Sequence, residues 1–242
     1  MSRLSRPRII LVACLLVVGS VALVAGVRLA SHGPAAGKAS DSSPGARPFP
    51  GDIGGSAQLD AGRYVSSLPF PVPVSATVPA GWRSEVAGPY AVFLSTQDGG
   101  GNDGPAVLAL LVSPLVYADP CQGQPPDSPA ASVNDFVTAV AALRGLSVTG
   151  PKDVTVGGLR GKQVTLTVSG DRGSCQGGAD QVMTLPLGHA FGLEPGDTMS
   201  LTALDDTGIL LILEEKTTSN ATATDRAQLA AVVESMSIGG KT

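Results

Sequence analysis

The sequence has little of what acid–base catalysis usually needs. Only two of the 242 residues are histidine, His32 and His189, although histidine is the side chain that most readily exchanges protons near neutral pH. The Gly-x-Ser-x-Gly pattern of many serine hydrolases is also missing. Its nearest match, Gly173–Gly177, has a cysteine at the position of the nucleophile. These absences predict a protein that is not an enzyme.

Aromatic residues are scarce, at 4% of the chain, with one tryptophan and three tyrosines. Proteins that bind carbohydrate on an open surface usually display several exposed aromatic side chains, so this function is not expected. The core must then consist mainly of valine, leucine, isoleucine and alanine. Trp82 follows Gly81, and we expect it to be buried at one end of a sheet rather than to stack on a ligand.

Positive charge is in short supply beyond the N-terminus. The chain after Arg28 contains 12 basic and 20 acidic residues, which gives it a net charge of −8. An acidic surface repels the phosphate backbone, so nucleic acid is not expected as a partner. The same charge argues against a domain that lies flat on an anionic membrane.

Cysteine is rare as well, with three residues in the chain. Cys14 falls within an apolar run, which leaves Cys121 and Cys175 for the rest of the protein. A cysteine pair in an oxidising compartment is typical of a disulfide bond, which we predict here. Because no histidine lies near either residue, a zinc site is not expected, and we predict no metal or cofactor.

The N-terminus carries the strongest positive signal in the sequence. An uninterrupted apolar run of 19 residues, Ile9–Val27, is preceded by three arginines and followed by Arg28. This length is about enough to cross the ~30 Å hydrocarbon core of a bilayer as a helix. Positively charged flanks stay on the cytoplasmic side. We therefore predict a cytoplasmic tail at 1–8 and a transmembrane signal anchor at 9–28.

Two alternatives to an uncleaved anchor remain open. A signal peptidase could cleave after the run, near the weak small-residue site Val24–Gly26, or Cys14 could carry a lipid. Thirteen more apolar residues follow Cys14, whereas a lipidated cysteine should precede a polar tether. The preferred interpretation is a single-pass protein of the cell membrane. Its eight-residue tail is too short for a cytoplasmic signalling domain.

Composition divides the exported part into two segments. Residues 29–62 are dominated by alanine, glycine, proline and serine, so this segment cannot bury enough apolar area to fold and is predicted to be a flexible linker. Residues 63–239 are long enough to form one domain with a real core. We predict that this domain is extracytoplasmic.

Apolar patterns place strands and two helices in that domain. The predicted strands lie at 70–78, 90–95, 106–117, 153–156, 162–168, 181–187, 199–204 and 209–214. One helix is expected after the capping residue Ser132, with Gly145 as its stop, and a second from Thr224, with Thr222 and Asp225 as a capping box. Turn residues at 98–104, 157–158 and 205–208 predict hairpins. The fold class is α+β, a mainly antiparallel sheet with two helices packed on it, both on one face.

Two pairs of neighbouring carboxylates could carry chemistry. Asp205–Asp206 lies in a predicted turn, and Glu214–Glu215 ends a predicted strand close to Lys216. Both pairs are expected to be solvated surface charge. A weak calcium site at the aspartate pair is an alternative, although the spaced ligands of an EF-hand loop are missing.

Several short segments, each nonspecific alone, follow one another in an informative order. They are Leu59–Tyr64, Ala76–Trp82, Val116–Cys121, Val154–Gly158 with Gly161–Lys162, Cys175, Leu204–Ile212 and Glu234–Ile238. In this order they resemble a group of exported, membrane-anchored actinobacterial domains of unknown function, over residues 59–238. The order of elements is also similar to the PsbP-like fold, which includes actinobacterial lipoproteins. The resemblance implies a scaffold for binding and assembly and no particular reaction.

Together these features predict an anchored binding or protein-interaction module of the cell envelope. Its expected partners are the membrane, through the N-terminal helix, and an unknown envelope protein or a small apolar ligand. One alternative is an envelope hydrolase that uses His189 with a nearby carboxylate. A purely structural envelope protein is another.

Overall fold

A computed structural model describes residues 45–50, 55–66, 69–96, 104–121, 128–168, 180–186 and 188–239. The predicted cytoplasmic tail and signal anchor lie outside these residues. Within the described part of the chain, none of the helices is both long and apolar enough to span a bilayer.

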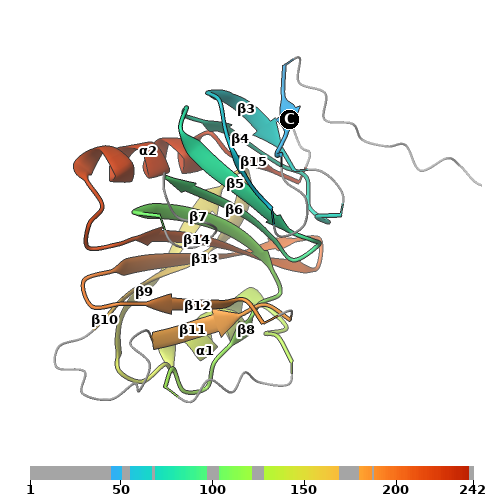
Figure 1. Cartoon of the computed structure of the whole chain (residues 1–242). Coiled ribbons are helices and arrows are strands. Elements are labelled where there is room, and N and C mark those ends of the chain that lie inside the picture. The colour runs from blue at the N-terminus through green and yellow to red at the C-terminus, as the bar shows by residue number, and fades with distance from the viewer. Residues whose placement is uncertain are drawn as a thin grey trace, which may run out of the picture. The chain divides into compact units, whose positions relative to one another are not determined.

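The centre of the fold is a sheet of eight strands (Figure 1). Every neighbouring pair in this sheet is antiparallel. From one edge to the other the strands are β2 (Ser56–Gln58), β5 (Trp82–Ala87), β6 (Ala91–Thr96), β7 (Ala106–Val112), β14 (Ile209–Thr217), β13 (Thr198–Asp206), β10 (Leu159–Val168) and β9 (Leu146–Val156).

Two smaller sheets and two helices complete the fold. One small sheet has the order β1 (Arg47–Pro48), β3 (Gly62–Val65), β4 (Val74–Val78) and β15 (Ser237–Ile238). The other has the order β12 (Ala190–Leu193), β11 (Asp180–Thr184) and β8 (Leu115–Val116). The helices are α1 (Val133–Ala141) and α2 (Ala223–Glu234). The α+β class with a mainly antiparallel sheet and two helices is thus confirmed.

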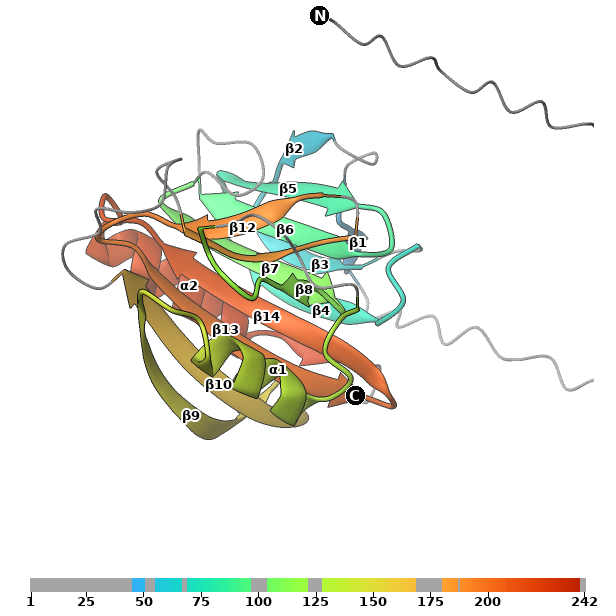
Figure 2. The same ribbon diagram turned by 90° about the horizontal axis from the view of Figure 1, so that it is seen from below.

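The two helices cover opposite faces of the large sheet, so the prediction that both share one face is wrong. Alternate residues of the middle strands enter two separate cores. Phe93 and Ile212 belong to the core under α1, whereas Leu94 and Leu213 belong to the core under α2. Figure 2 shows α1 in front of the large sheet and α2 behind it. A sheet buried on both faces needs apolar residues on both, which explains the continuous apolar runs of β7 and β14.

Both helices begin where the sequence predicts. The Ser132 side chain accepts a hydrogen bond from the backbone N–H of Asp135 at 3.1 Å. At α2 the Thr222 hydroxyl accepts from the N–H of Asp225, and the Asp225 carboxylate accepts from the N–H of Thr222 at 2.8 Å, which completes a capping box. These bonds satisfy N–H groups that have no partner inside the helix.

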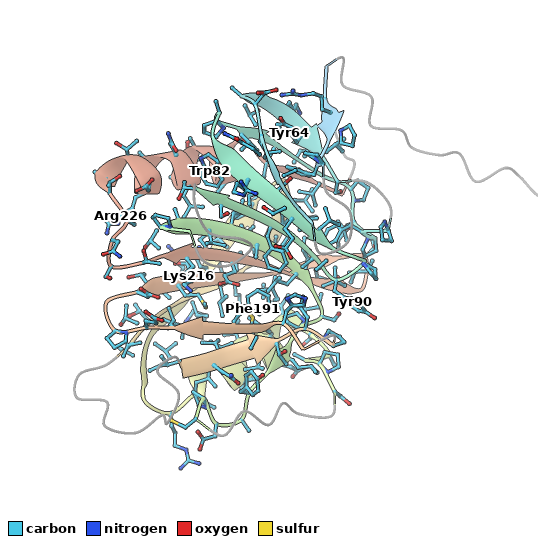
Figure 3. The ribbon with its side chains drawn as sticks, viewed as in Figure 1. Tyr64, Trp82, Tyr90, Phe191, Lys216 and Arg226 are labelled. Carbon is cyan, nitrogen blue, oxygen red and sulfur yellow. The ribbon has the colours of Figure 1, made fainter. Side chains whose placement is uncertain are left out.

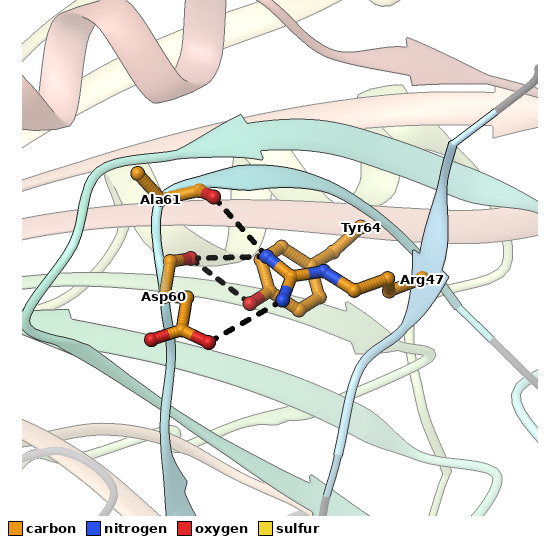
Figure 4. Close-up of polar contacts among 4 residues, drawn as sticks. All are labelled: Arg47, Asp60, Ala61 and Tyr64. Atoms are coloured by element: carbon orange, nitrogen blue, oxygen red, sulfur yellow. Dashed lines mark hydrogen bonds and ion pairs between the residues drawn. The ribbon is translucent and has the colours of Figure 1, made fainter.

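The predicted linker at 29–62 extends too far, because the folded domain begins before residue 63. Figure 4 shows how Arg47 is held: its guanidinium lies 4.6 Å from the centroid of the Tyr64 ring and donates to the Ala61 carbonyl at 3.1 Å. Phe49 is buried and stacks on the same tyrosine. The few apolar residues of this segment suffice to pack it because β1 and β2 add to existing sheet edges.

Candidate functional site

An open groove of about 460 Å³ runs along one side of α1. Its floor and walls come from the end of β8, from the segment that leads into α1 and from α1 itself. The lining residues are Val116, Tyr117, Ala118, Ser128, Pro129, Ala130, Asp135, Ala139 and Ala142. The volume falls within the range of about 300–1,000 Å³ that small-molecule sites usually have.

Small residues on one side of α1 create this space. Phe136 and Val140 point into the core and fix the helix on the sheet. Asp135, Ala139 and Ala142 follow one another at helical spacing beside that core face, so they form one wall of the groove. Because two of these three side chains are a single methyl group, space remains between the helix and the neighbouring β8 segment.

The opposite wall is held by the small sheet. Val116 pairs with Met183 of β11, and the Tyr117 N–H donates to the Val182 carbonyl at 3.0 Å. Val116 and Tyr117 are both buried. The Tyr117 hydroxyl forms no hydrogen bond with a described residue, which leaves it available to a ligand.

The groove is mainly apolar and carries one charged side chain. Asp135 accepts a hydrogen bond from the Ser132 hydroxyl at 2.7 Å, so its carboxylate is fixed at the first turn of α1. A carboxylate at this position repels an anionic group and can accept a hydrogen bond from a hydroxyl or an amine. The groove therefore suits a small apolar molecule with a neutral polar group.

The prediction that Glu214 and Glu215 are solvated surface charges is wrong. Strand β14 continues to Thr217, so both residues lie within the strand rather than at its end. Glu214 is 1% exposed, and burial raises its pKa to about 7, an effect that Lys216 partly offsets. Burial also raises the pKa of Glu215, with Lys152 opposing the shift. The Glu215 carboxylate accepts a hydrogen bond from Gln163 at 3.3 Å.

The aspartate pair was predicted to lie in a turn, but both residues are the last two of strand β13, and the turn itself is Thr207–Gly208. Asp205 is exposed and accepts a hydrogen bond from the Gly208 N–H at 2.8 Å, which closes the hairpin between β13 and β14. In the described segments, three or more histidine, cysteine, aspartate or glutamate residues nowhere converge as a metal ion would require. The alternative of a calcium site gains no support from this arrangement.

The structure describes only one of the two cysteines of the predicted disulfide. Cys121 is disulfide-bonded, and Cys175 lies outside the described residues, so the pairing of the two stays a prediction. We expect that alkylation without reduction leaves Cys121 and Cys175 unlabelled, and that a peptide containing both is found by mass spectrometry after proteolysis. Labelling of Cys175 under these conditions would contradict the pairing.

His189 lies in the turn between β11 and β12, where its side chain is exposed. Its backbone carbonyl accepts hydrogen bonds from the Leu185 N–H and from the Thr184 hydroxyl. Its ring forms no hydrogen bond or ion pair with any residue that the structure describes. The hydrolase hypothesis requires a carboxylate or serine at this ring, and the described residues do not supply one.

Trp82 is a core residue, as predicted. It is 1% exposed, and its indole N–H donates to the side-chain carbonyl of Gln228 on α2 at 3.1 Å. Figure 3 shows it on β5, at the end of the sheet nearest α2. The bond joins the first strands of the domain to its last helix, which are far apart in the sequence.

The sequence did not point to the α1 groove. Its lining residues are ordinary apolar and small side chains from two neighbouring segments of the chain, within 116–118 and 128–142, and Asp135 was interpreted only as part of a helix cap. The signal that was available is the pair of alanines, Ala139 and Ala142, beside the core face of a predicted amphipathic helix.

No protein-family model matches the chain, and no curated protein matches it. Several solved structures are partly similar to it, among them the following three. LpqN of Mycobacterium tuberculosis, described as involved in cell envelope biogenesis, is 17% identical, with 75% of this chain and 92% of that chain covered and a TM-score of 0.38. The cyanobacterial PsbP protein CyanoP from Synechocystis sp. PCC 6803 is 12% identical, with coverage of 77% and 94% and a TM-score of 0.37.

The third is a protein from Bacteroides thetaiotaomicron that is 8% identical, with a TM-score of 0.37. The similarity covers 74% of this chain and 48% of that one, so the chain spans about half the length of the Bacteroides protein. Similarity at this level assigns neither a fold family nor a function. The PsbP-like fold therefore stays a prediction.

Proposed function

We propose that this protein is a binding module of the cell envelope that holds a small, largely apolar ligand in the groove along α1. The observation that carries the proposal is the groove itself. It is a concave space of about 460 Å³ whose lining is apolar apart from a few polar groups, among them Asp135. This composition is typical of small-molecule sites.

The location in the envelope is supported by the first 28 residues of the sequence. The basic residues followed by the run Ile9–Val27 are typical of a signal anchor. A disulfide at Cys121 fits an oxidising compartment outside the cytoplasm. In this arrangement the domain that carries the groove lies outside the cytoplasm, where it can meet the apolar and amphiphilic molecules of the envelope.

The charge of Asp135 narrows the class of ligand. A fatty-acid-like anion would bring its carboxylate close to the Asp135 carboxylate, and like charges repel, an effect that water moderates because Asp135 is exposed. A neutral alcohol or amide of the same apolar size avoids this repulsion and can donate a hydrogen bond. The proposed ligand is therefore an apolar molecule with an uncharged polar group.

The first test blocks the groove with a larger side chain. We expect Ala139→Phe to weaken the binding of 1-hexanol by at least about tenfold, because the phenyl ring occupies the space between α1 and the β8 segment. Ala141→Phe is the matched control, since Ala141 is exposed on the same helix and does not line the groove. The measurement is an NMR titration of the full chain in lipid nanodiscs with 1-hexanol. Partition of 1-hexanol into the lipid is the same for all variants, so it cancels in the comparison.

The second arm of this test varies the charge of the ligand. Hexanoate has the same chain as 1-hexanol and differs in its carboxylate, so it should bind more weakly to the wild type. Asp135→Asn should reduce this difference, because it removes the repelling charge. Equal binding of 1-hexanol to the wild type and to Ala139→Phe would contradict the proposal.

A further inference from the structure

A second, polar hollow of about 270 Å³ lies where the ends of β12 and β14 meet the start of β7. It shares no lining residue with the α1 groove. The residues around it are Pro105, Glu194, Asp197, Lys216, Thr218, Ser219 and Asn220. Figure 3 shows the position of Lys216 on β14. Three of these residues, Glu194, Asp197 and Lys216, are charged.

Asp197 is fixed in place within this hollow. It is 4% exposed, and its carboxylate accepts hydrogen bonds from the backbone N–H groups of Glu194 and Ser219, each at 3.2 Å. These bonds connect the turn before β13 with the segment between β14 and α2. The position of the carboxylate is therefore set by the backbone of two segments and does not depend on a ligand.

Lys216 lacks the hydrogen-bond partners that its charge requires. Its side chain is 14% exposed, and its ammonium nitrogen lies 3.9 Å from the Asp197 carboxylate, which is beyond hydrogen-bond distance. It forms no other ion pair or hydrogen bond with a described residue. An ammonium group has three donors, and leaving them unmatched in a largely buried position costs free energy. An acceptor within the hollow would remove this cost.

Glu214 is a buried acceptor without a hydrogen-bond donor among the described residues. It lies two residues before Lys216 on β14, so both side chains point to the same face of the sheet. Its cross-strand neighbours are Leu201 and Ala109, which are both apolar and buried. The Oε2 atom of Glu214 is buried without a hydrogen-bond partner in the described part of the chain. Glu214 does not line the hollow, and its effect there is to add negative charge behind Lys216.

We propose that the hollow binds a small zwitterion of the α-amino-acid type, with its carboxylate on Lys216 and its ammonium group on Asp197. A simple anion would satisfy Lys216 but would also meet the Asp197 carboxylate. A simple cation would satisfy the carboxylates but would meet the Lys216 ammonium. A molecule with both charges matches both sides of the site, and a volume just below the usual range for drug-sized ligands fits a molecule of this size.

Three small probes test this proposal on the full chain in detergent by calorimetric titration. Glycine carries both charges, acetate only the negative one and methylamine only the positive one. We expect glycine to bind at least about tenfold more tightly than either of the others. Failure of glycine to bind, or an affinity for acetate equal to that for glycine, would overturn the proposal.

A variant pair locates the site. Lys216→Met should reduce glycine affinity by about tenfold or more, whereas Lys162→Met should leave it unchanged, because Lys162 pairs with Asp153 on β9 and β10, away from the hollow. Circular dichroism establishes whether the variant is folded, and the three-probe comparison on the wild type holds in either case. Unchanged glycine binding by a folded Lys216→Met variant would also overturn the proposal. Binding of 1-hexanol in the α1 groove is independent of both results.

Discussion

Replacing Glu214 by glutamine is expected to stabilise the protein at pH 8 by about 3 kcal/mol and to leave its stability at pH 4 nearly unchanged. The cause is the burial of this carboxyl group, which raises its pKa from 4.5 to about 7 in the folded state. Below pH 4.5 the group is protonated in both states, so it costs nothing there. Between pH 4.5 and 7 the unfolded chain loses the proton first, and stability falls until the folded protein is also ionised.

The measurement is urea unfolding of the full chain at several pH values, followed by the fluorescence of Trp82. Glu214→Gln should remove the decline in stability between pH 4.5 and 7 that this residue causes. Glu234→Gln is the matched control, because Glu234 is exposed on α2 and the same change there should have little effect. Burial shifts the pKa of Glu215 in the same direction, so a smaller decline should remain. A variant less stable than the wild type at pH 8 would contradict the account.

Replacing Trp82 by alanine is expected to destabilise the protein by about 4 kcal/mol, because a large, fully buried side chain leaves a cavity behind. Trp82 is surrounded by the core that α2 covers, and its loss should weaken the contact between β5 and that helix. The measurement is urea unfolding followed by circular dichroism, since the variant has no tryptophan. A loss below about 1 kcal/mol would mean that Trp82 does not support the core.

A double-mutant cycle separates the hydrogen bond from the packing. Trp82→Phe removes the indole N–H and keeps most of the apolar volume, and Gln228→Met removes the acceptor. We expect a coupling energy of about 1 kcal/mol between the two changes. Binding of 1-hexanol should be unaffected by either change in folded protein, because neither residue lines the α1 groove.

The local features of the fold could be predicted from the sequence. The caps at Ser132 and Thr222 depend on residues within four positions of one another. The hairpin turns at 157–158 and 207–208 depend on glycine at the turn itself, and the second is also held by Asp205 at the end of β13, which accepts from the Gly208 N–H. These interactions are made between residues close together in the sequence, so they can be predicted without knowing the rest of the fold.

Features set by distant contacts could not be predicted in the same way. Short strands such as β12 and β15 have no clear pattern of their own and exist because they pair with β11 and β4. The N-terminal segment looked like a linker because its few anchors, such as Arg47 and Phe49, matter only once Tyr64 is in place. The continuous apolar runs of β7 and β14 are typical of strands buried on both faces, and the prediction that both helices share one face did not use this signal.

The candidate sites illustrate the same limit. Glu214 was assigned to the surface because the apolar run of its strand ends just before it, yet the strand continues and neighbouring strands enclose the side chain. Asp135 was recognised as a cap residue, and the groove beside it depends on the β8 segment, which the sequence does not place near α1. Features formed by a single segment, such as the helix cap, could be predicted from the sequence. Features formed by two or more segments, such as the groove and the burial of Glu214, could not.

The most direct test of the central claim is to locate the bound ligand. The full chain in lipid nanodiscs, with its alanine methyl groups labelled, is titrated with 1-hexanol, and intermolecular NMR contacts are recorded. The account predicts contacts to the methyl groups of Ala118, Ala139 and Ala142, with none to Ala141. Saturable binding with contacts elsewhere in the domain, or no contact with these three alanines at saturation, would contradict it.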